Sequence, residues 1–147
     1  MHDDLSKVIS VSQKSVVITG GNRGIGLDIT EAFVNAGYFV VVGARQERGL
    51  KDRFGDHIVF QEIDVRNESD HKKLVELAVK QTGGLDVYVN NAGFSAWSPI
   101  EKINGAFLDD ILNTNLKGAF WGCKSAASEL KSGGSIINIS SIAGKRG

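Results

Sequence analysis

The chain of 147 residues is 41% apolar and 23% charged, which is the balance of one ordinary globular domain. Its 17 basic and 17 acidic side chains cancel, so the charge points neither to nucleic acid nor to an anionic membrane as a partner. The acidic start is unlike a signal peptide and no apolar run approaches the ~20 residues of a membrane helix, so we expect a protein of the cytoplasm.

Short apolar runs alternate with helical patterns along the chain. The runs predicted as strands are, in chain order, 15–19, 38–44, 57–63, 86–90 and 134–140. The predicted helices are 24–36, 68–82 and 107–131; Gly37 closes the first, Asn67 caps the second and Gly83 ends it. The segment 92–105, with the single proline, is predicted as a loop over the edge of the sheet where a ligand binds.

The predicted strands are apolar on both faces rather than at every second residue. This pattern is typical of parallel strands that are covered by helices on both sides. The fold class we expect is therefore α/β, a doubly wound Rossmann-type parallel sheet with five strands, formed by residues 1–147 as one nucleotide-binding domain.

The first turn from strand to helix is rich in glycine and reads TGGNRGIG. Gly20, Gly24 and Gly26 allow a sharp turn and leave room for a ligand to approach the main chain. The helix that follows offers unpaired N–H groups and a partial positive charge, which suit a pyrophosphate. A plain tight turn is the alternative, but the position after an apolar strand and before a helix favours a phosphate site.

Four motifs together carry a resemblance to a known family. They are TGGNRGIG at 19–26, NNAG at 90–93, NTNLKG at 113–118 and NISSIAG at 138–144. In this order and spacing they resemble the short-chain dehydrogenase/reductase family. The resemblance implies binding of NAD(P)(H), hydride transfer between the nicotinamide and a carbonyl or alcohol substrate, and a homo-oligomer.

The resemblance also implies where the cofactor would bind. The pyrophosphate would lie on the glycine loop, the adenine amino group on Asp64 with Val65 against the ring, and the adenosine ribose beside NNAG. Taken alone, Asp64 could equally be a loop aspartate that caps a turn. The implied cofactor-binding residues are Gly20, Asn22, Arg23, Gly24, Ile25, Gly26, Arg45, Asp64, Val65, Asn90, Ala92 and Gly93.

The end of the second strand, VVVGARQ, bears on the choice of cofactor. NAD sites place an acidic residue there for the ribose hydroxyl, whereas NADP sites place a cation for the 2′-phosphate. Here Ala44 stands where the acid is expected, Arg45 follows it, and Arg23 lies in the glycine loop. These two arginines could also be ordinary solvated side chains, but together they predict NADP(H) rather than NAD(H).

The catalytic residues implied by the resemblance are only partly within the chain. Ser141, with Ser140 as its neighbouring alternative, corresponds to the serine that binds the substrate oxygen, and Asn115 to the helix asparagine of a proton path. The family's proton donor is a tyrosine followed four residues later by a lysine. That pair would fall beyond Gly147, and neither Tyr38 nor Tyr88 has a lysine at this spacing.

We therefore expect a Rossmann domain that is truncated or split after the fifth strand, with its C-terminal part missing. The first possibility is a reductase whose tyrosine and lysine lie on a complementary C-terminal polypeptide. The second is a fragment that binds cofactor without turnover, and the others are a non-catalytic interaction module and a methyltransferase that uses S-adenosylmethionine. The substrate could be a ketone, a β-ketoacyl thioester or a polyol, and the three scattered histidines predict no metal site.

Overall fold

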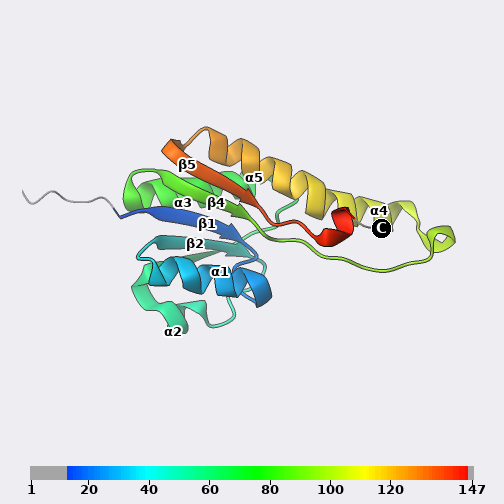
Figure 1. The fold of residues 1–147 in the computed structure, drawn as a ribbon, viewed down its shortest axis with the longest axis horizontal. Coiled ribbons are helices and arrows are strands. Elements are labelled where there is room, and N and C mark those ends of the chain that lie inside the picture. Colours follow the sequence, from blue (N-terminus) through cyan, green and yellow to red (C-terminus); the bar gives the residue numbers. More distant parts are fainter. Residues whose placement is uncertain (1–12, 146–147) are drawn as a thin grey trace, which may run out of the picture.

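The computed structural model describes residues 13–145, which form one parallel sheet covered by helices on both faces (Figure 1). The order across the sheet is β3-β2-β1-β4-β5, so β1 is at the centre and the chain winds outward in both directions. This is the expected doubly wound arrangement. The strands are β1 (Ser15–Thr19), β2 (Phe39–Ala44), β3 (Ile58–Glu62), β4 (Leu85–Asn90) and β5 (Leu130–Asn138).

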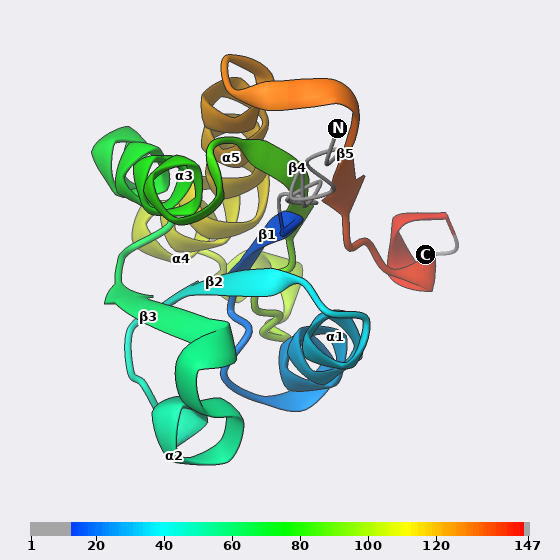
Figure 2. The same ribbon diagram turned by 90° about the vertical axis from the view of Figure 1, so that its left-hand side faces the viewer.

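The helices divide between the two faces of the sheet. Figure 2, which views the strands nearly end-on, shows α1 and α2 on one face and α3, α4 and α5 on the other. Their bounds are α1 (Gly24–Asn35), α2 (Leu50–Phe54), α3 (Glu68–Thr82), α4 (Gly105–Ile111) and α5 (Gly118–Ala127). None of the helices in the described part is long and apolar enough to cross a membrane.

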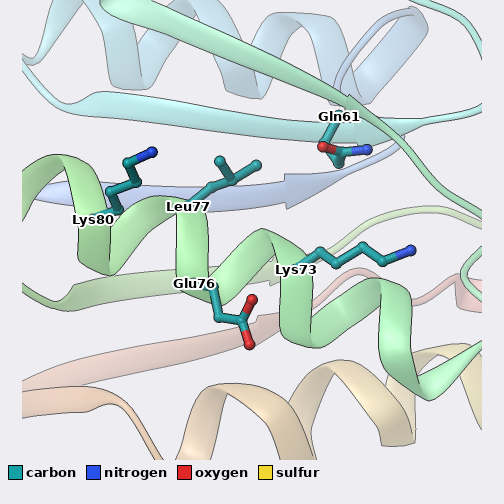
Figure 3. A pocket seen from close by; sticks show the side chains of 5 residues that line it. All are labelled: Gln61, Lys73, Glu76, Leu77 and Lys80. Atoms are coloured by element: carbon teal, nitrogen blue, oxygen red, sulfur yellow. The ribbon is translucent and has the colours of Figure 1, made fainter.

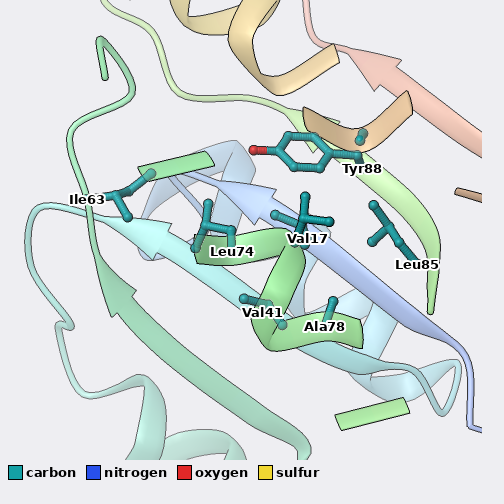
Figure 4. Packing of buried hydrophobic residues seen from close by; sticks show 9 residues of the cluster. Val17, Val41, Ile63, Leu74, Ala78, Leu85 and Tyr88 are labelled. Carbon is teal, nitrogen blue, oxygen red and sulfur yellow. The ribbon is translucent and has the colours of Figure 1, made fainter. Parts of the chain in front are cut away.

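The core has two halves because successive side chains of a strand point to opposite faces. Val17, Val41 and Tyr88 pack beneath α3 and α5, together with Leu74 and Ala78 of α3 (Figure 4). The alternate strand residues Val16, Ile18, Val40, Val42 and Val89 form the other half, beneath α1 and α2. The alternation explains why the central strands had to be apolar at nearly every position.

The two edge strands are less buried than their sequences led us to expect. β1 is fully buried and β2 and β4 are mostly buried, whereas β3 is half-buried and β5 is mostly exposed. The prediction of strands covered on both faces therefore holds for the centre of the sheet. In the part of the chain that the structure describes, both edges have only partial cover.

The long helix predicted over 107–131 is three consecutive segments. α4 continues into a π-helical stretch, Leu112–Lys117, and then into α5. The helix ends at Ala127, where the Ser128 hydroxyl donates to the Ser125 carbonyl and the chain turns into β5. β5 consequently begins at Leu130, opposite Leu85, and ends at Asn138, before the predicted limit of 140.

Other differences are local. The short α2 was not predicted, because its five residues are mostly charged. Asn67 precedes α3 as expected, but its side chain accepts no hydrogen bond from the helix N–H groups. The segment 92–104 does not fold back over the sheet; it leaves β4 and runs outward before α4 begins (Figure 1). The remaining strand and helix limits agree with the predicted ones to within one residue.

Candidate functional site

A cleft of about 1080 Å³ lies at the carboxyl ends of the strands. In a parallel sheet these ends share one edge, and the cleft is formed by the loops that follow β1, β2, β3 and β4. Its walls contain every predicted cofactor-binding residue except Asn90. The full lining is Gly20, Asn22, Arg23, Gly24, Ile25, Gly26, Gly43, Ala44, Arg45, Gln46, Arg48, Ile63, Asp64, Val65, Arg66, Asn91, Ala92, Gly93, Phe94, Asp110 and Thr114.

The glycine loop is tightly folded against the start of α1. Gly20 and Gly24 have φ angles of +68° and +50°, in the left-handed region that favours glycine. A Cβ atom on Gly26 would lie 2.8 Å from the carbonyl carbon of Gly20 and closer still to its oxygen. The side chain of Arg23, the residue before α1, makes no capping hydrogen bond, so the first N–H groups of this helix face the cleft without a cap from it.

Asn91, which the sequence analysis did not single out, holds the glycine loop in place. Its Nδ2 donates to the carbonyl oxygens of Thr19 at 3.0 Å and Gly20 at 3.2 Å. The hydroxyl of Thr19 in turn accepts from the backbone N–H groups of Asn91 and Ala92, each at 3.1 Å. The loops after β1 and β4 are thus joined by four hydrogen bonds and form one wall of the cleft.

Asn90 occupies the opposite face of β4. Its Nδ2 donates to Asn138 Oδ1 at 2.8 Å, and its side chain is buried beneath α5, where it touches Gly122 and Cys123. Because side chains alternate along a strand, Asn90 shares the face of Tyr88 and cannot point toward the glycine loop. The side chain therefore does not line the cleft and instead links β4 to β5.

The acidic and basic side chains of the loop after β2 point in different directions. Arg45 and Arg48 line the cleft, whereas Glu47 turns away and accepts from the N–H groups of Gly49 and Lys51 at 2.7 and 2.6 Å. Nδ2 of Asn22 in the glycine loop donates to the carbonyl of Gln46 at 2.7 Å, which fixes this loop against the first one. Arg48 itself has a φ of +59°, an uncommon conformation for a side-chain-bearing residue.

Asp64 and Arg66 form a charged pair at the other end of the cleft. The guanidinium contacts both carboxylate oxygens of Asp64 at 2.5–3.0 Å and reaches Asp110 of α4 at 3.4 Å. Hydrogen bonds from the Arg66 side chain hold the pKa of the Asp64 carboxyl below its ordinary value. Asp64 is therefore an anion whose charge is largely matched by Arg66.

The two predicted catalytic side chains lie outside the lining of the cleft. Asn115, in the π-helical stretch, forms two hydrogen bonds with the backbone of Phe94. Its Oδ1 accepts from the N–H at 3.0 Å and its Nδ2 donates to the carbonyl at 2.7 Å. Ser141 follows β5, and its hydroxyl oxygen accepts from Ala143 N–H at 3.2 Å. This contact leaves the O–H of Ser141 for another acceptor, such as a substrate oxygen.

A second, smaller hollow carries no comparable arrangement. It measures about 260 Å³ and lies on the surface of α3, beside Gln61 of β3 (Figure 3). Its polar side chains, such as Lys73, Glu76 and Lys80, are exposed and extend into solvent rather than toward one point. Among residues 13–145, no three His, Cys, Asp or Glu side chains gather as metal ligands would. The cleft at the strand ends is the better candidate.

Comparison with known proteins identifies the family of the chain. The family model described as short chain dehydrogenase matches residues 14–147. The chain belongs to this family.

A 1,2-dihydroxy-1,2-dihydronaphthalene dehydrogenase of a Ralstonia species is 37% identical over 139 residues, which are 88% of this chain and 53% of that protein. A glucose/ribitol-type short-chain dehydrogenase/reductase from Brucella melitensis superposes with a TM-score of 0.87 at 32% identity, over 91% of this chain and 59% of the other. The structure of ElxO with NADP bound gives a TM-score of 0.82 at 32% identity, over 92% and 58% of the two chains. The chain thus spans about half the length of the curated relatives it matches.

Several side chains of the cleft were missed from the sequence, among them Asn91, Arg48 and Arg66. Asn91 could have been found, because it follows a strand whose alternation turns Asn90 away from the cleft. Arg48 and Arg66 had no signal, since an arginine in a polar loop is normally solvated. Only the positions of the loops after β2 and β3 bring them to the same cleft.

Proposed function

We propose that this chain is the NADP(H)-binding part of a short-chain reductase that transfers a hydride between the nicotinamide and a carbonyl or alcohol substrate. The observation that carries the proposal is the cleft at the strand ends, whose walls join the glycine loop, the start of α1 and the loop after β3. NADP(H) supplies the hydride chemistry when it is bound. The residues of this chain bind and orient it.

Each part of the cleft suits one part of the dinucleotide. The N–H groups at the start of α1 suit the pyrophosphate, because Gly24 and Gly26 keep side chains out of its way. Asp64 and Val65 suit the adenine, and Ala92 and Gly93 suit the adenosine ribose. Asn91 acts behind them by fixing the glycine loop.

The preference for NADP(H) is supported by the charges near the end of β2. Ala44 offers no carboxylate to a ribose hydroxyl, while Arg23, Arg45 and Arg48 all line the same cleft. A guanidinium matches a phosphate geometrically and electrostatically. The neighbour ElxO, whose structure has NADP bound, is consistent with this preference.

For catalysis, we propose that Ser141 donates its O–H to the substrate oxygen and that Asn115 holds the segment after β4 in position. Both groups are exposed at the carboxyl end of the sheet. The proton donor would be the tyrosine, with its lysine, that the family resemblance places after Gly147. This pair would lie on a complementary polypeptide, covalently continuous or separate.

The exposed apolar side chains support this partner and a homo-oligomer. Ile137, Ile139 and Ile142 lie exposed along and just after β5, at an edge of the sheet, where a further segment could cover them. A second row of exposed apolar side chains lies along α4, the π-helical stretch and α5, and a second copy of the chain could cover it. It consists of Leu108, Leu112, Leu116 and Phe120.

The cofactor assignment is tested by titrating NADPH and NADH into the wild-type chain and into Arg45→Asp. The variant should bind NADPH at least about tenfold more weakly and NADH more tightly, because a carboxylate repels the 2′-phosphate and accepts from a ribose hydroxyl. Arg53→Asp is the matched control, since Arg53 lies on α2 outside the cleft and pairs with Glu31. An unchanged preference in Arg45→Asp would refute the assignment.

The alternative is a chain that binds cofactor without turnover, or an interaction module. The intact mass of the native protein under denaturing conditions distinguishes these cases. A second species with a Tyr-x-x-x-Lys segment, together with NADPH-dependent reduction of a ketone, supports the split reductase. A single 15.8 kDa species that binds NADPH and reduces no carbonyl substrate supports the alternative.

A further inference from the structure

His71 is a fully buried polar side chain in the first turns of α3. Its Nδ1 lies 2.7 Å from the hydroxyl of Tyr88 on β4, and its Nε2 lies 2.8 Å from the backbone carbonyl of Val65. One ring thus bridges the core beneath α3 and the loop after β3. That loop forms the end of the cleft assigned above to adenine.

The two contacts fix the tautomer of the ring. The carbonyl of Val65 can only accept a hydrogen bond, so Nε2 must carry the hydrogen. Nδ1 of the neutral ring is then an acceptor, and the hydroxyl of Tyr88 donates to it. Burial lowers the pKa of His71, which keeps the ring neutral. In this arrangement both ring nitrogens of His71, the hydroxyl of Tyr88 and the carbonyl of Val65 are hydrogen-bonded.

The carbonyl that His71 holds is packed from the other side as well. A Cβ atom on Gly118 would lie 3.2 Å from the Val65 oxygen, so the start of α5 is close against it. The neighbouring Asp64 is bound to α3, the helix of His71, because its backbone N–H donates to the Asp70 carboxylate at 3.0 Å. The loop of Asp64, Val65 and Arg66 therefore takes its position from the first turns of α3.

We propose that His71 is a positioning residue that sets the affinity of the cleft for the adenosine half of the cofactor, by holding the Val65 carbonyl. This inference rests on the proposed function, since it assumes that the cleft binds a dinucleotide. Without the bond from Nε2, the loop would populate several conformations, and only a fraction would present Asp64 and Val65 correctly. The apparent affinity falls by that fraction.

Three substitutions separate the two hydrogen bonds. His71→Asn places a polar group near the Nδ1 position, within reach of Tyr88, and removes the donor to Val65. Tyr88→Phe removes the hydroxyl and keeps that donor, so it is the matched control for damage to the core. His71→Gln restores a donor near the Nε2 position. The probes are NADPH and 2′,5′-ADP, which carries the adenosine half alone, and the stability of each variant is measured by urea unfolding.

We expect His71→Asn to bind both probes about tenfold more weakly. Tyr88→Phe should lose stability and bind both probes like the wild type, and His71→Gln should recover most of the affinity. If His71→Asn does not fold, weaker binding by Tyr88→Phe or His71→Gln would still overturn the inference, since both keep a donor for Val65.

Equal weakening in His71→Asn and Tyr88→Phe would overturn the inference, because general loosening of the core would then explain the effect. Unchanged affinity in a folded His71→Asn would overturn it as well. Either result leaves the proposed function standing, provided that the wild type binds NADPH. A wild type that binds neither NADPH nor NADH would refute the proposed function, and this inference with it.

Discussion

Gly26→Ala is the sharpest single perturbation of the cleft. The added Cβ atom would lie 2.5 Å from Asn91 Nδ2 and 2.8 Å from the carbonyl carbon of Gly20, and would overlap the carbonyl oxygen. None of these atoms belongs to a flexible side-chain end, because Asn91 is fixed by two hydrogen bonds. The start of α1 and the glycine loop must therefore separate by about 1 Å to restore ordinary contact distances.

This separation should damage binding more than stability. Overpacking of this kind costs about 1–3 kcal/mol of unfolding free energy. A displacement of about 1 Å takes an N–H···O hydrogen bond out of range, and charge-assisted bonds to a phosphate contribute about 1.5–3 kcal/mol each. Loss of one such bond would weaken NADPH binding at least about tenfold.

The assay is a fluorescence titration of NADPH, together with thermal unfolding followed by circular dichroism. Gly37→Ala is the control: Gly37 has a φ of +81°, open space around it, and a position after the far end of α1. Its alanine variant should lose about 1–2 kcal/mol of stability and bind NADPH normally. Folded Gly26→Ala that binds NADPH like the wild type, or equal weakening in both variants, would show the reasoning to be wrong.

Three further predictions concern the packing around the cleft. Gly122→Ala would place a Cβ atom against Asn90 and push α5 off β4, so urea unfolding should show a loss of about 1–3 kcal/mol; unchanged stability would contradict this packing. Burial lowers the pKa of His71, and the hydrogen bond to the Val65 carbonyl and the charge of Asp70 offset this only in part. The unfolded chain therefore takes up the proton first, so the unfolding free energy should fall as the pH drops below about 6.5 and be flat just above it; a variant His71→Gln should lack this dependence. Asn115→Leu removes both hydrogen bonds to the Phe94 backbone, and limited proteolysis should cut the segment 94–104 up to about tenfold faster; equal cutting rates would mean that the side chain does not anchor it.

The centre of the fold could be predicted because burial dictates its sequence. The β-branched runs of β1 and β2 face helices on both sides, and no other element of this length needs apolar residues at every position. The left-handed glycines Gly37 and Gly83 likewise mark the ends of α1 and α3 for a steric reason.

The edges could not be predicted in the same way. The start of β5, LKSGG, is polar and glycine-rich, so it looks like a turn; it is a strand because Leu130 pairs with Leu85 across the sheet. The π-helical stretch, LNTNLK, carries no sequence signal of a wider turn, which is visible only in the backbone. Both features depend on tertiary contacts rather than on local preference.

The charged residues of the cleft show why residue types alone could not predict whether it favours an anionic ligand. The sequence around the strand ends holds nearly as many acids as arginines, which suggests no preference for an anion. In the structure, Arg66 forms ion pairs with Asp64 and Asp110. Glu47 accepts hydrogen bonds from the backbone N–H groups of Gly49 and Lys51. Among residues 13–145, the arginines that line the cleft and form no ion pair are Arg23, Arg45 and Arg48.

Because the acidic side chains are paired in this way, the cleft has a local excess of positive charge although the chain has no net charge. Such an excess attracts a phosphate-rich ligand over distances near the Debye length, about 8–10 Å at physiological salt. It also makes the proposed preference sensitive to ionic strength, because the 2′-phosphate adds charge that NAD(H) lacks. The ratio of NADH to NADPH dissociation constants should therefore fall as salt is raised. A ratio that does not change with salt would mean that shape, and not these three arginines, decides between the cofactors.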